Sequence, residues 1–216
     1  MLNLGKLSVE LVDSMGNDLR VVNSARISLS SSSDRLDEKD VKLIKYLARH
    51  KHYTPFEHCV VSMIINCPLY IRSQIHRHRV FSYNEVSRRY TNKGISFYVP
   101  DKFGRQQGTN KQKGQRVFDS DTTEQLRNMY IDSIRQSYEV HRKMLMMGVS
   151  REDARATLPN CLMTSFYMTG SLRNWADFIR LRAADDAQSE VQEIANMCLQ
   201  NLGNIAPVSI EALLDG

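Results

Sequence analysis

The sequence predicts an α+β fold with antiparallel-type strands and long helices, in one domain that covers residues 1–216. Three observations support this prediction. Stretches typical of strands and of long helices do not alternate strictly along the chain, as they would in a regular α/β protein. The length of 216 residues suits one globular domain with a sizeable core. No internal repeat and no linker-like stretch divides the sequence.

The N-terminal segment is expected to form a strand and a helix joined by a turn. The strand covers about Lys6 to Val12, and Gly16-Asn17-Asp18 is typical of a turn. Asp18 is a residue type that caps helices, so we expect it to begin a helix that runs towards Ile27.

A helix, a buried strand and a second helix are expected next. Apolar residues recur on one face from about Glu38 to Arg49, which predicts the first helix. The run from Cys59 to Cys67 is rich in β-branched and sulfur-containing residues and predicts a largely buried strand. Pro68 would end this strand and stand in the first turn of a helix that passes through Gln74 and Arg77.

The second half of the chain is expected to be mainly helical, with two short strands. Caps, glycines and prolines mark the boundaries. The expected elements are, in order, a strand over Ile95–Val99, a helix over about Thr122–Met147, a short helix capped by Ser150 that runs through Arg155, a strand over Leu162–Thr169, and one helix over about Leu172–Leu202 that Ala206-Pro207 separates from a short tail.

Positive charge is concentrated in one stretch. The chain has a formal net charge of +5, and residues 102–118 contain five cations and no acid. Three glycines and four glutamines in the same stretch predict a mobile surface loop. Such a loop either attracts anionic substrates over a distance or only keeps the protein soluble.

The composition indicates a cytoplasmic protein without a disulfide framework. The four cysteines are scattered, with no Cys-x-x-Cys pair, so we expect buried free thiols in a reducing compartment and no zinc site. The N-terminal segment carries Glu10 and Asp13 and does not resemble a signal peptide. No apolar stretch approaches the length that spans a membrane.

Charged and polar residues that could bind a ligand are most concentrated between Arg72 and Tyr90, in the run RSQIHRHRVFSYNEVSRRY. This run contains five arginines, two histidines and one acid, Glu85. Guanidinium groups bind phosphate through paired hydrogen bonds, and so many of them repel one another unless an anion or an acid neutralises them. Interleaved aromatic and neutral polar residues suit a flat heterocycle. The run therefore predicts a site for a phosphate joined to a heterocyclic ring, whereas a charge run in general is more often a solvated surface.

The spacing of this run resembles the hallmark of the flavin-dependent (alternative) thymidylate synthases, which is Arg-His-Arg, seven residues and a serine. Here the hallmark stands at Arg77–Arg79 and Ser87. The resemblance continues in the same order along the chain through VELVDSMGNDL near the start, HYTPFEH at 52–58, ARATLP at 154–159 and LRNWADFIRLRA at 172–183.

This resemblance implies a homotetramer with active sites built between subunits. It also implies that the protein methylates dUMP to dTMP. Methylenetetrahydrofolate would be the carbon donor, and FAD reduced by NADPH would be the hydride source. No nucleic acid is expected as a partner.

The resemblance also implies roles for individual residues. The positions that match flavin-binding positions are His52, Thr54, Glu57, Arg77, His78, Arg79, Glu85, Ser171, Leu172, Arg173 and Asp177. The positions that match dUMP-binding positions are Gln74, Arg77, Glu85, Ser87, Arg88, Arg89, Arg155 and Arg182.

Arg182 matches the arginine that activates the uracil ring, and it is the expected catalytic residue. An arginine stays protonated at working pH and can stabilise negative charge that develops on the ring. Without the resemblance, an ion pair with Asp185 or Asp186 would be its simplest role.

Four positions depart from the usual pattern of the family. Ser171 stands where asparagine is common, and Asp177 stands where asparagine or histidine is usual. Asp186 often corresponds to histidine or glutamate. Arg88 replaces a small or neutral residue, so its backbone N–H is its expected contact with phosphate.

Two other functions compete with this one. The basic segments and the tyrosines would also suit a nucleic-acid-binding module without catalysis. A cysteine-dependent thymidylate synthase would use Cys161 as its nucleophile, but the residues around Cys161 do not match that enzyme. The sequence has no Gly-x-Gly-x-x-Gly after a strand, and its histidine clusters lack metal-site spacing, so we expect neither a Rossmann domain nor a metal.

Overall fold

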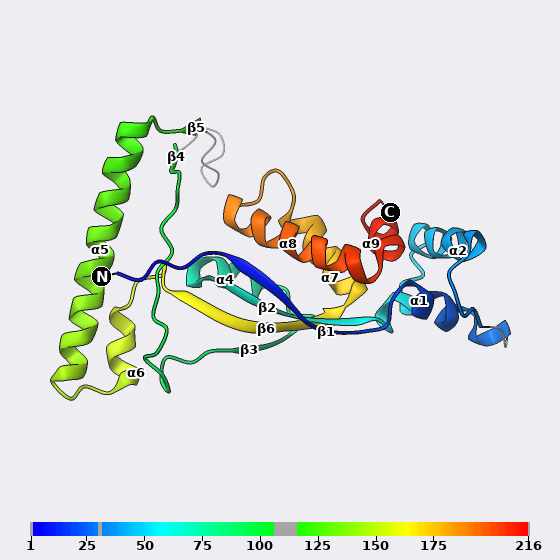
Figure 1. Cartoon of the computed structure of the whole chain (residues 1–216), viewed down its shortest axis with the longest axis horizontal. Coiled ribbons are helices and arrows are strands. Elements are labelled where there is room, and N and C mark those ends of the chain that lie inside the picture. Colours follow the sequence, from blue (N-terminus) through cyan, green and yellow to red (C-terminus); the bar gives the residue numbers. More distant parts are fainter. Residues whose placement is uncertain (1, 30–31, 106–115, 216) are drawn as a thin grey trace. The chain divides into compact units, whose positions relative to one another are not determined.

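The structure is a computed structural model that describes residues 2–29, 32–105 and 116–215. It confirms the α+β class, because a four-stranded sheet is combined with helices (Figure 1). Across the sheet, the strands follow the order β1, β2, β6 and β3. Their bounds are Ser8–Met15 for β1, Val60–Pro68 for β2, Met163–Ser171 for β6 and Ser82–Glu85 for β3.

The two central strands, β2 and β6, run antiparallel. The amide of Leu172 donates to the carbonyl of Cys59, and the amide of Leu69 donates to the carbonyl of Leu162, each at 3.0 Å. Alternate side chains of β2 are fully buried, as expected for a strand with one face on a core. These strands lie within one or two residues of the two that the sequence predicts at 59–67 and 162–169.

The chain forms two compact units, and each is assembled from segments that are distant in sequence. Unit 1 consists of Met1–Leu7, Asn66–Gln74 and Glu85–Ser165. Unit 2 consists of Ser8–Ile65, Ile75–Asn84 and Phe166–Gly216. Strands β2, β3 and β6 contribute residues to both units. The single domain over residues 1–216 stays a prediction.

In unit 2, three helices lie along one face of the strands (Figure 1). They are α7 (Leu172–Arg182), α8 (Ser189–Ile205) and α9 (Pro207–Asp215). Trp175 of α7 is fully buried and donates its indole N–H to the carbonyl of Val61 on β2 at 3.2 Å. This bond fixes α7 on the sheet, and α7 carries several of the predicted site residues.

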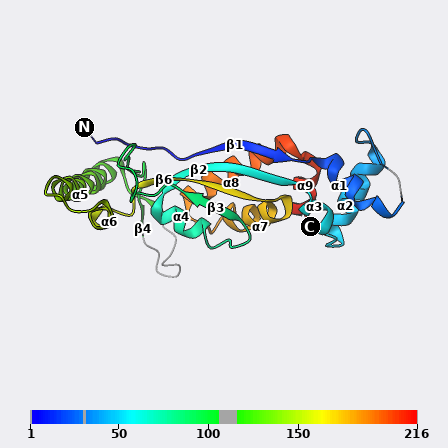
Figure 2. The ribbon, with the colours of Figure 1, turned by 90° about the horizontal axis from the view of Figure 1, so that it is seen from below.

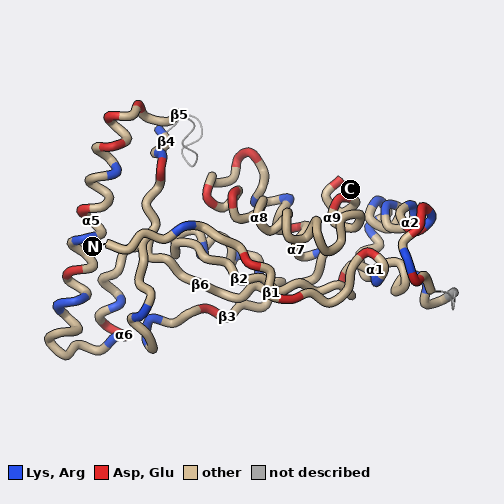
Figure 3. The backbone as a smooth tube through the Cα atoms, in the orientation of Figure 1, with Lys and Arg blue, Asp and Glu red and all other residues tan. Residues whose placement is uncertain are grey.

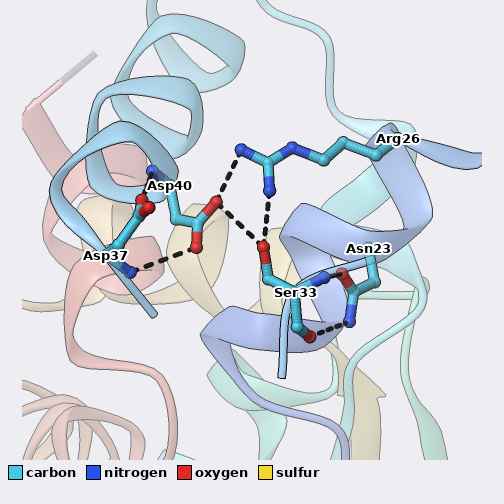
Figure 4. A network of polar contacts seen from close by, with 5 residues as sticks. All are labelled: Asn23, Arg26, Ser33, Asp37 and Asp40. Carbon is cyan, nitrogen blue, oxygen red and sulfur yellow. Dashed lines mark hydrogen bonds and ion pairs between the residues drawn. The ribbon is translucent and has the colours of Figure 1, made fainter. Parts of the chain in front are cut away.

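A buried ion pair joins the first two helices of unit 2. The remaining helices of this unit are α1 (Asp18–Ala25), the 3₁₀ turn η1 (Ile27–Leu29), α2 (Glu38–Arg49) and α3 (Thr54–Glu57). Arg26 Nη2 lies 2.6 Å from Asp40 Oδ1, and Arg26 Nη1 donates to Ser33 Oγ at 2.6 Å (Figure 4). Asp37 forms a capping box with Asp40 at the start of α2. Because Asp40 is only 1% exposed, its charge needs this partner.

In unit 1, the long helix α5 lies beside α6 and the 3₁₀ turn η2 (Figures 1 and 2). The bounds are Ser120–Met146 for α5, Arg151–Ala154 for α6 and Arg155–Thr157 for η2. Ile134 of α5 packs in a core with Phe97 and Leu162. Ser150 caps α6 as predicted, because its Oγ accepts from the amide of Asp153 at 3.1 Å.

Unit 1 also contains α4 (Leu69–Ile75), apart from its last residue, and a short antiparallel pair, β4 (Gly104–Arg105) with β5 (Arg116–Val117). This pair flanks most of the stretch that the sequence predicts to be a basic loop. Residues 106–115 of that loop lie outside the described residues. Within the described part of the chain, no helix has both the length and the apolar character needed to cross a membrane.

The predicted helix over residues 172–202 is wrong, because the structure has two helices there, α7 and α8. The break at residues 183–188 contains Asp185 and Asp186. Aspartate is a weak helix former, and its charge is unfavourable near the negative end of a helix dipole. This break leaves Arg182 as the last residue of α7.

The expected tail after Ala206 is the helix α9. Pro207 fits the first turn of a helix, where its missing N–H costs no hydrogen bond. The carboxylate of Asp18 accepts from the amides of Val208 at 3.1 Å and of Ser209 at 2.8 Å. Asp18 therefore contacts the start of α9 rather than capping α1.

The N-cap of α1 is Asn17 instead, which corrects the prediction for Asp18. The side-chain oxygen of Asn17 accepts from the amides of Leu19 at 3.1 Å and of Arg20 at 3.3 Å. The turn before it is confirmed, because Gly16 has a φ of 88°, a left-handed value that glycine adopts without strain.

Two further differences concern strands. Residues 95–99 do not form the predicted strand. Phe97 makes isolated bridges with Leu4 and Leu162, and single backbone hydrogen bonds join Ser96 to Met163 and Tyr98 to Cys161. Conversely, the sequence gives no clear signal for β3. Its residues, Ser-Tyr-Asn-Glu, lack the alternation of apolar side chains that marks a strand.

Candidate functional site

Unit 1 contains a cavity of about 500 Å³ that both polar and apolar side chains line. Three arginines, two glutamates and two hydroxyl residues line it, together with apolar side chains. The polar members are Arg72, Arg88, Arg155, Glu85, Glu152, Ser87 and Thr164. The backbone colouring shows basic residues both in the segment that follows β3 and at α6 (Figure 3).

Four of the predicted nucleotide-binding residues line this cavity: Glu85, Ser87, Arg88 and Arg155. Glu85 ends β3, so Ser87 and Arg88 follow directly where the strand stops. Arg155 begins η2 after the short helix that Ser150 caps. The structure thus brings together two predicted segments that lie far apart in the sequence.

Glu85 is held from two elements. Thr164 on β6 donates its hydroxyl to Glu85 Oε1 at 2.6 Å. Arg72 on α4 lies with its Nε 3.3 Å from the same oxygen. One carboxylate oxygen is therefore engaged by protein groups at the wall of the cavity.

Arg72, Thr164 and Glu152 line the cavity, although the family resemblance assigns them no individual role. Arg72 belongs to the basic run and stands two residues before Gln74 on the same helix, so its place in that run could have indicated it. Thr164 lies in a strand of mixed composition, and nothing in the local pattern marks it. Its role follows only from the pairing of strands.

Arg88 and Arg89 have different environments. Arg88 donates from Nη1 to the carbonyl of Lys93 at 2.7 Å and from Nη2 to the carbonyl of Gly94 at 3.2 Å. Burial lowers the pKa of Arg88. Arg89 is exposed, with its guanidinium 5.2 Å from the ring centre of Tyr90. Arg89 and Gln74 lie in unit 1 but do not line this cavity.

In unit 2, a hydrogen bond connects the predicted catalytic arginine with a residue that is predicted to bind flavin. Arg182 donates from Nε to His78 Nε2 at 3.0 Å. His78 must then carry its proton on Nδ1, because Nε2 acts as the acceptor. Burial and the charge of Arg182 lower the pKa of His78, which favours this neutral form. Burial and the charge of Arg77 lower the pKa of Arg182 in turn.

The Arg77–Arg79 segment is fixed by the turn that follows it. Tyr83 donates its hydroxyl to the carbonyl of His78 at 2.9 Å, and Asn174 donates its amide to the carbonyl of Val80 at 3.0 Å. A Cβ on Gly170 would lie 2.5 Å from the ring of Phe81, so only glycine allows this approach. Arg77 and Arg79 themselves are exposed and available to a ligand.

A second pair of predicted flavin-binding segments also meets in unit 2. Arg173 Nη1 lies 2.6 Å from Glu57 Oε1, and its guanidinium lies 4.6 Å from the ring centre of Tyr53. Ser171 is the N-cap of α7, with its Oγ accepting from the amide of Asn174 at 3.4 Å. Serine, like the asparagine that is common at this position, is a residue type that caps helices, so Ser171 preserves the cap of α7.

The other predicted flavin residues have separate surroundings. Leu172 is fully buried in the core, so its side chain packs against protein. Asp177 pairs with Arg180 at 2.8 Å. Thr54 begins α3, and His52 is exposed two residues earlier. The roles of these four residues stay predictions.

The cysteines do not offer a nucleophile. All four are free and buried. Burial raises the pKa of Cys161, which is only 4% exposed, and raises that of Cys67 to about 12. The reactive species of cysteine is the thiolate, and burial favours the protonated thiol instead. Among the described residues, no group of three His, Cys, Asp or Glu side chains could hold a metal ion.

Comparisons with known proteins match nearly the whole chain. A family model described as thymidylate synthase complementing protein matches residues 10–208. A flavin-dependent thymidylate synthase of Thermosipho melanesiensis is 39% identical over 211 residues, which cover 98% of this chain and 92% of that protein. An enzyme of the same name from Thermus thermophilus is 36% identical over 218 residues, which cover 99% of this chain and 79% of that protein.

Two solved structures are similar over the same extent. The UMP/dUMP methylase PolB from Streptomyces cacaoi, bound with 5-Br dUMP, has a TM-score of 0.87 and 29% identity, covering 100% of this chain and 97% of that one. The same protein bound with 5-Br UMP has a TM-score of 0.89 and 31% identity, covering 99% and 96%.

Proposed function

The chain belongs to the flavin-dependent thymidylate synthase family, and on this basis we propose that it methylates dUMP to dTMP. Methylenetetrahydrofolate donates the carbon, and FAD reduced by NADPH supplies the hydride. The observation that carries the proposal is the unit 1 cavity, which Glu85, Ser87, Arg88 and Arg155 line together. Its arginines suit the phosphate of a nucleotide, and its carboxylates and hydroxyls suit the sugar and the ring.

The residues of unit 2 fit FAD. Arg77 and Arg79 are exposed cations that suit its phosphates, and Arg173 is held in place by Glu57. His78 carries an Nδ1–H that can donate to an oxygen or nitrogen of the ring system. Bound FAD supplies the redox chemistry, and the protein residues bind it and orient it.

Arg182 is the proposed catalytic residue. A uracil ring becomes a better nucleophile when negative charge develops on its imide edge, and a fixed cation stabilises that charge. His78 restricts the direction of the Arg182 guanidinium through the 3.0 Å hydrogen bond to Nε. This bond limits the orientations in which the guanidinium can meet the ring.

We also infer a homotetramer with active sites shared between subunits, located in the cytoplasm. Family membership supports the assembly, and four buried free thiols suit a reducing compartment. Light scattering coupled to size-exclusion chromatography measures the assembly directly. A monomeric but active enzyme would contradict it.

Turnover by the purified protein tests the proposed function. The protein should retain FAD or take it up on reconstitution, NADPH should bleach the flavin band, and dUMP with methylenetetrahydrofolate should yield dTMP by chromatography. Arg182→Ala is expected to reduce dTMP formation far more than FAD content. A colourless protein that cannot be reconstituted, yet binds oligonucleotides with steep salt dependence, would instead support the nucleic-acid-binding module.

UMP is a second candidate substrate. The similarity to a UMP/dUMP methylase extends over 99–100% of this chain at 29–31% identity. The same assay with UMP in place of dUMP tests whether UMP is a substrate. If it is, 5-methyl-UMP should form. Formation of dTMP alone would restrict the enzyme to the deoxyribonucleotide.

A further inference from the structure

The loop that follows β3 is closed by one side chain. We define the substrate loop as residues 87–94, which begin at the cavity with Ser87 and Arg88. The two Nη atoms of Arg88 donate to the consecutive carbonyls of Lys93 and Gly94, at 2.7 and 3.2 Å. A planar guanidinium suits this two-pronged contact, which a lysine ammonium cannot reproduce.

The backbone is shaped for this contact. Gly94 has a φ of 64°, a left-handed value that glycine adopts without strain. Two other hydrogen bonds in the loop are local: the amide of Tyr90 donates to the carbonyl of Ser87 at 3.1 Å, and the amide of Lys93 donates to Thr91 Oγ1 at 3.1 Å. From outside the loop, Arg151 of α6 donates from Nη1 to the carbonyl of Tyr90 at 3.3 Å. Arg88 alone among these connects the cavity end of the loop to its far end.

The charge of Arg88 is not neutralised by this contact. Its two bonds go to carbonyl oxygens, which carry no net charge. Its Nε is buried and has no hydrogen-bond partner among the described residues, so part of the donor capacity of the guanidinium is unused. The position thus combines a structural contact with a cation that adjoins the cavity.

We propose that Arg88 is a positioning residue that holds the substrate loop closed before the nucleotide binds. Ser87 and the backbone N–H groups of the loop are then ordered in the free protein, which reduces the conformational entropy lost on binding. This inference rests on the proposed function, because it assigns the cavity to the nucleotide. It also goes further, since the arginine side chain replaces the small or neutral residue expected at this position.

Titration calorimetry of dUMP into the FAD-loaded protein tests the proposal with Arg88→Lys and Arg88→Met. Lysine keeps the charge but cannot bind both carbonyls, whereas methionine keeps only the length. If the two Nη hydrogen bonds of Arg88 hold the loop closed, both variants should raise the Kd for dUMP by roughly tenfold. This is the effect expected for the loss of about two hydrogen bonds. Their FAD content should equal that of the wild type, because the two Nη atoms of Arg88 donate to carbonyls of its own loop.

Arg127→Met is the matched control. Arg127 also donates to a backbone carbonyl, that of Pro100 at 3.2 Å in the same unit, but it does not line the cavity. Its Kd for dUMP should equal that of the wild type. An Arg88→Lys variant with wild-type affinity beside a weakened Arg88→Met variant would overturn the proposal in favour of charge alone. Wild-type affinity in both variants would overturn it as well.

Hydrogen exchange of the free protein gives a second measurement that needs no substrate. The amides of residues 89–93 should exchange slowly in the wild type and at least about tenfold faster in Arg88→Lys. Equal exchange in the two proteins would overturn the closed loop. This measurement remains valid if the wild type forms no dTMP, so failure of the proposed function and failure of the loop proposal give different results.

Discussion

At the scale of single residues, the candidate sites depend on partners that hold the functional side chains. Glu85 accepts from Thr164, His78 accepts from Arg182, and Arg173 pairs with Glu57. The family motifs identify one or both members of each pair, but the contact itself joins different elements. Thr164 shows the limit of sequence reasoning, because only the pairing of β6 with β3 brings it to Glu85.

Thr164→Val should weaken nucleotide binding. Valine has nearly the same shape as threonine but cannot donate to Glu85 Oε1, so the carboxylate loses a 2.6 Å hydrogen bond. We expect the Kd for dUMP to rise about threefold to tenfold, while the FAD content stays unchanged. Thr169→Val, on the same strand, removes a 2.9 Å bond to Ser62 and should leave dUMP binding unchanged. Equal effects of the two variants would contradict the role of Thr164.

The His78–Arg182 contact predicts a pH effect with a definite sign. Burial and the charge of Arg182 lower the pKa of His78 from its ordinary value of 6.5. Between the lowered pKa and 6.5, the unfolded chain binds a proton that the folded protein does not bind. The free energy of unfolding should therefore fall as the pH decreases through this window.

Nuclear magnetic resonance titration of the His78 ring in the ligand-free protein measures this pKa. Arg182→Leu removes one of its two lowering causes, so the pKa of His78 should rise towards 6.5 without reaching it, because burial remains. Arg135→Leu, on the exposed face of α5, serves as the charge control. A wild-type His78 that titrates above 6.5 would contradict the hydrogen bond in which Nε2 is the acceptor.

At the scale of elements, the sequence predicts those whose signals are local. The structure confirms the helix over 38–49 with the predicted bounds, and it confirms the cap at Ser150. The break after Arg182 and the short strand β3 could not be predicted in this way. In both places the local preference is weak, and pairing or packing with distant segments decides the structure.

The start of α9 is a further example, and it carries a prediction. Asp18 is 6% exposed and accepts from the amides of Val208 and Ser209. Asp18→Ala should lower the free energy of unfolding by about 1–2 kcal/mol, as for the loss of a helix cap with buried donors. Chemical denaturation measures this, with the exposed Asp34→Ala as a control that should change stability by less than about 0.5 kcal/mol. A smaller loss for Asp18→Ala than for the control would show that the contact does not stabilise α9.

At the scale of the whole molecule, the predicted site residues divide between the two units. Unit 1 holds Gln74, Glu85, Ser87, Arg88, Arg89 and Arg155, all of which are predicted to bind the nucleotide. Unit 2 holds every predicted flavin residue except Glu85, and it also holds Arg77 and Arg182, which are predicted to bind the nucleotide as well. The order of motifs along the chain does not reveal this division, because each unit is built from three separate segments. The division of the site residues follows from the pairing of β2, β3 and β6, which contribute residues to both units.

This division predicts that the two ligands protect different segments from hydrogen exchange. In FAD-free protein, dUMP alone should slow exchange at residues 85–89 and 151–158, because these segments carry most of the polar lining of the cavity. FAD alone should slow exchange at residues 52–57 and 171–177, where Glu57 pairs with Arg173. Residues 38–49 of α2 belong to neither set and should not respond to either ligand. Protection of residues 52–57 by dUMP, with residues 85–89 unchanged, would mean that the cavity of unit 1 is not the nucleotide site.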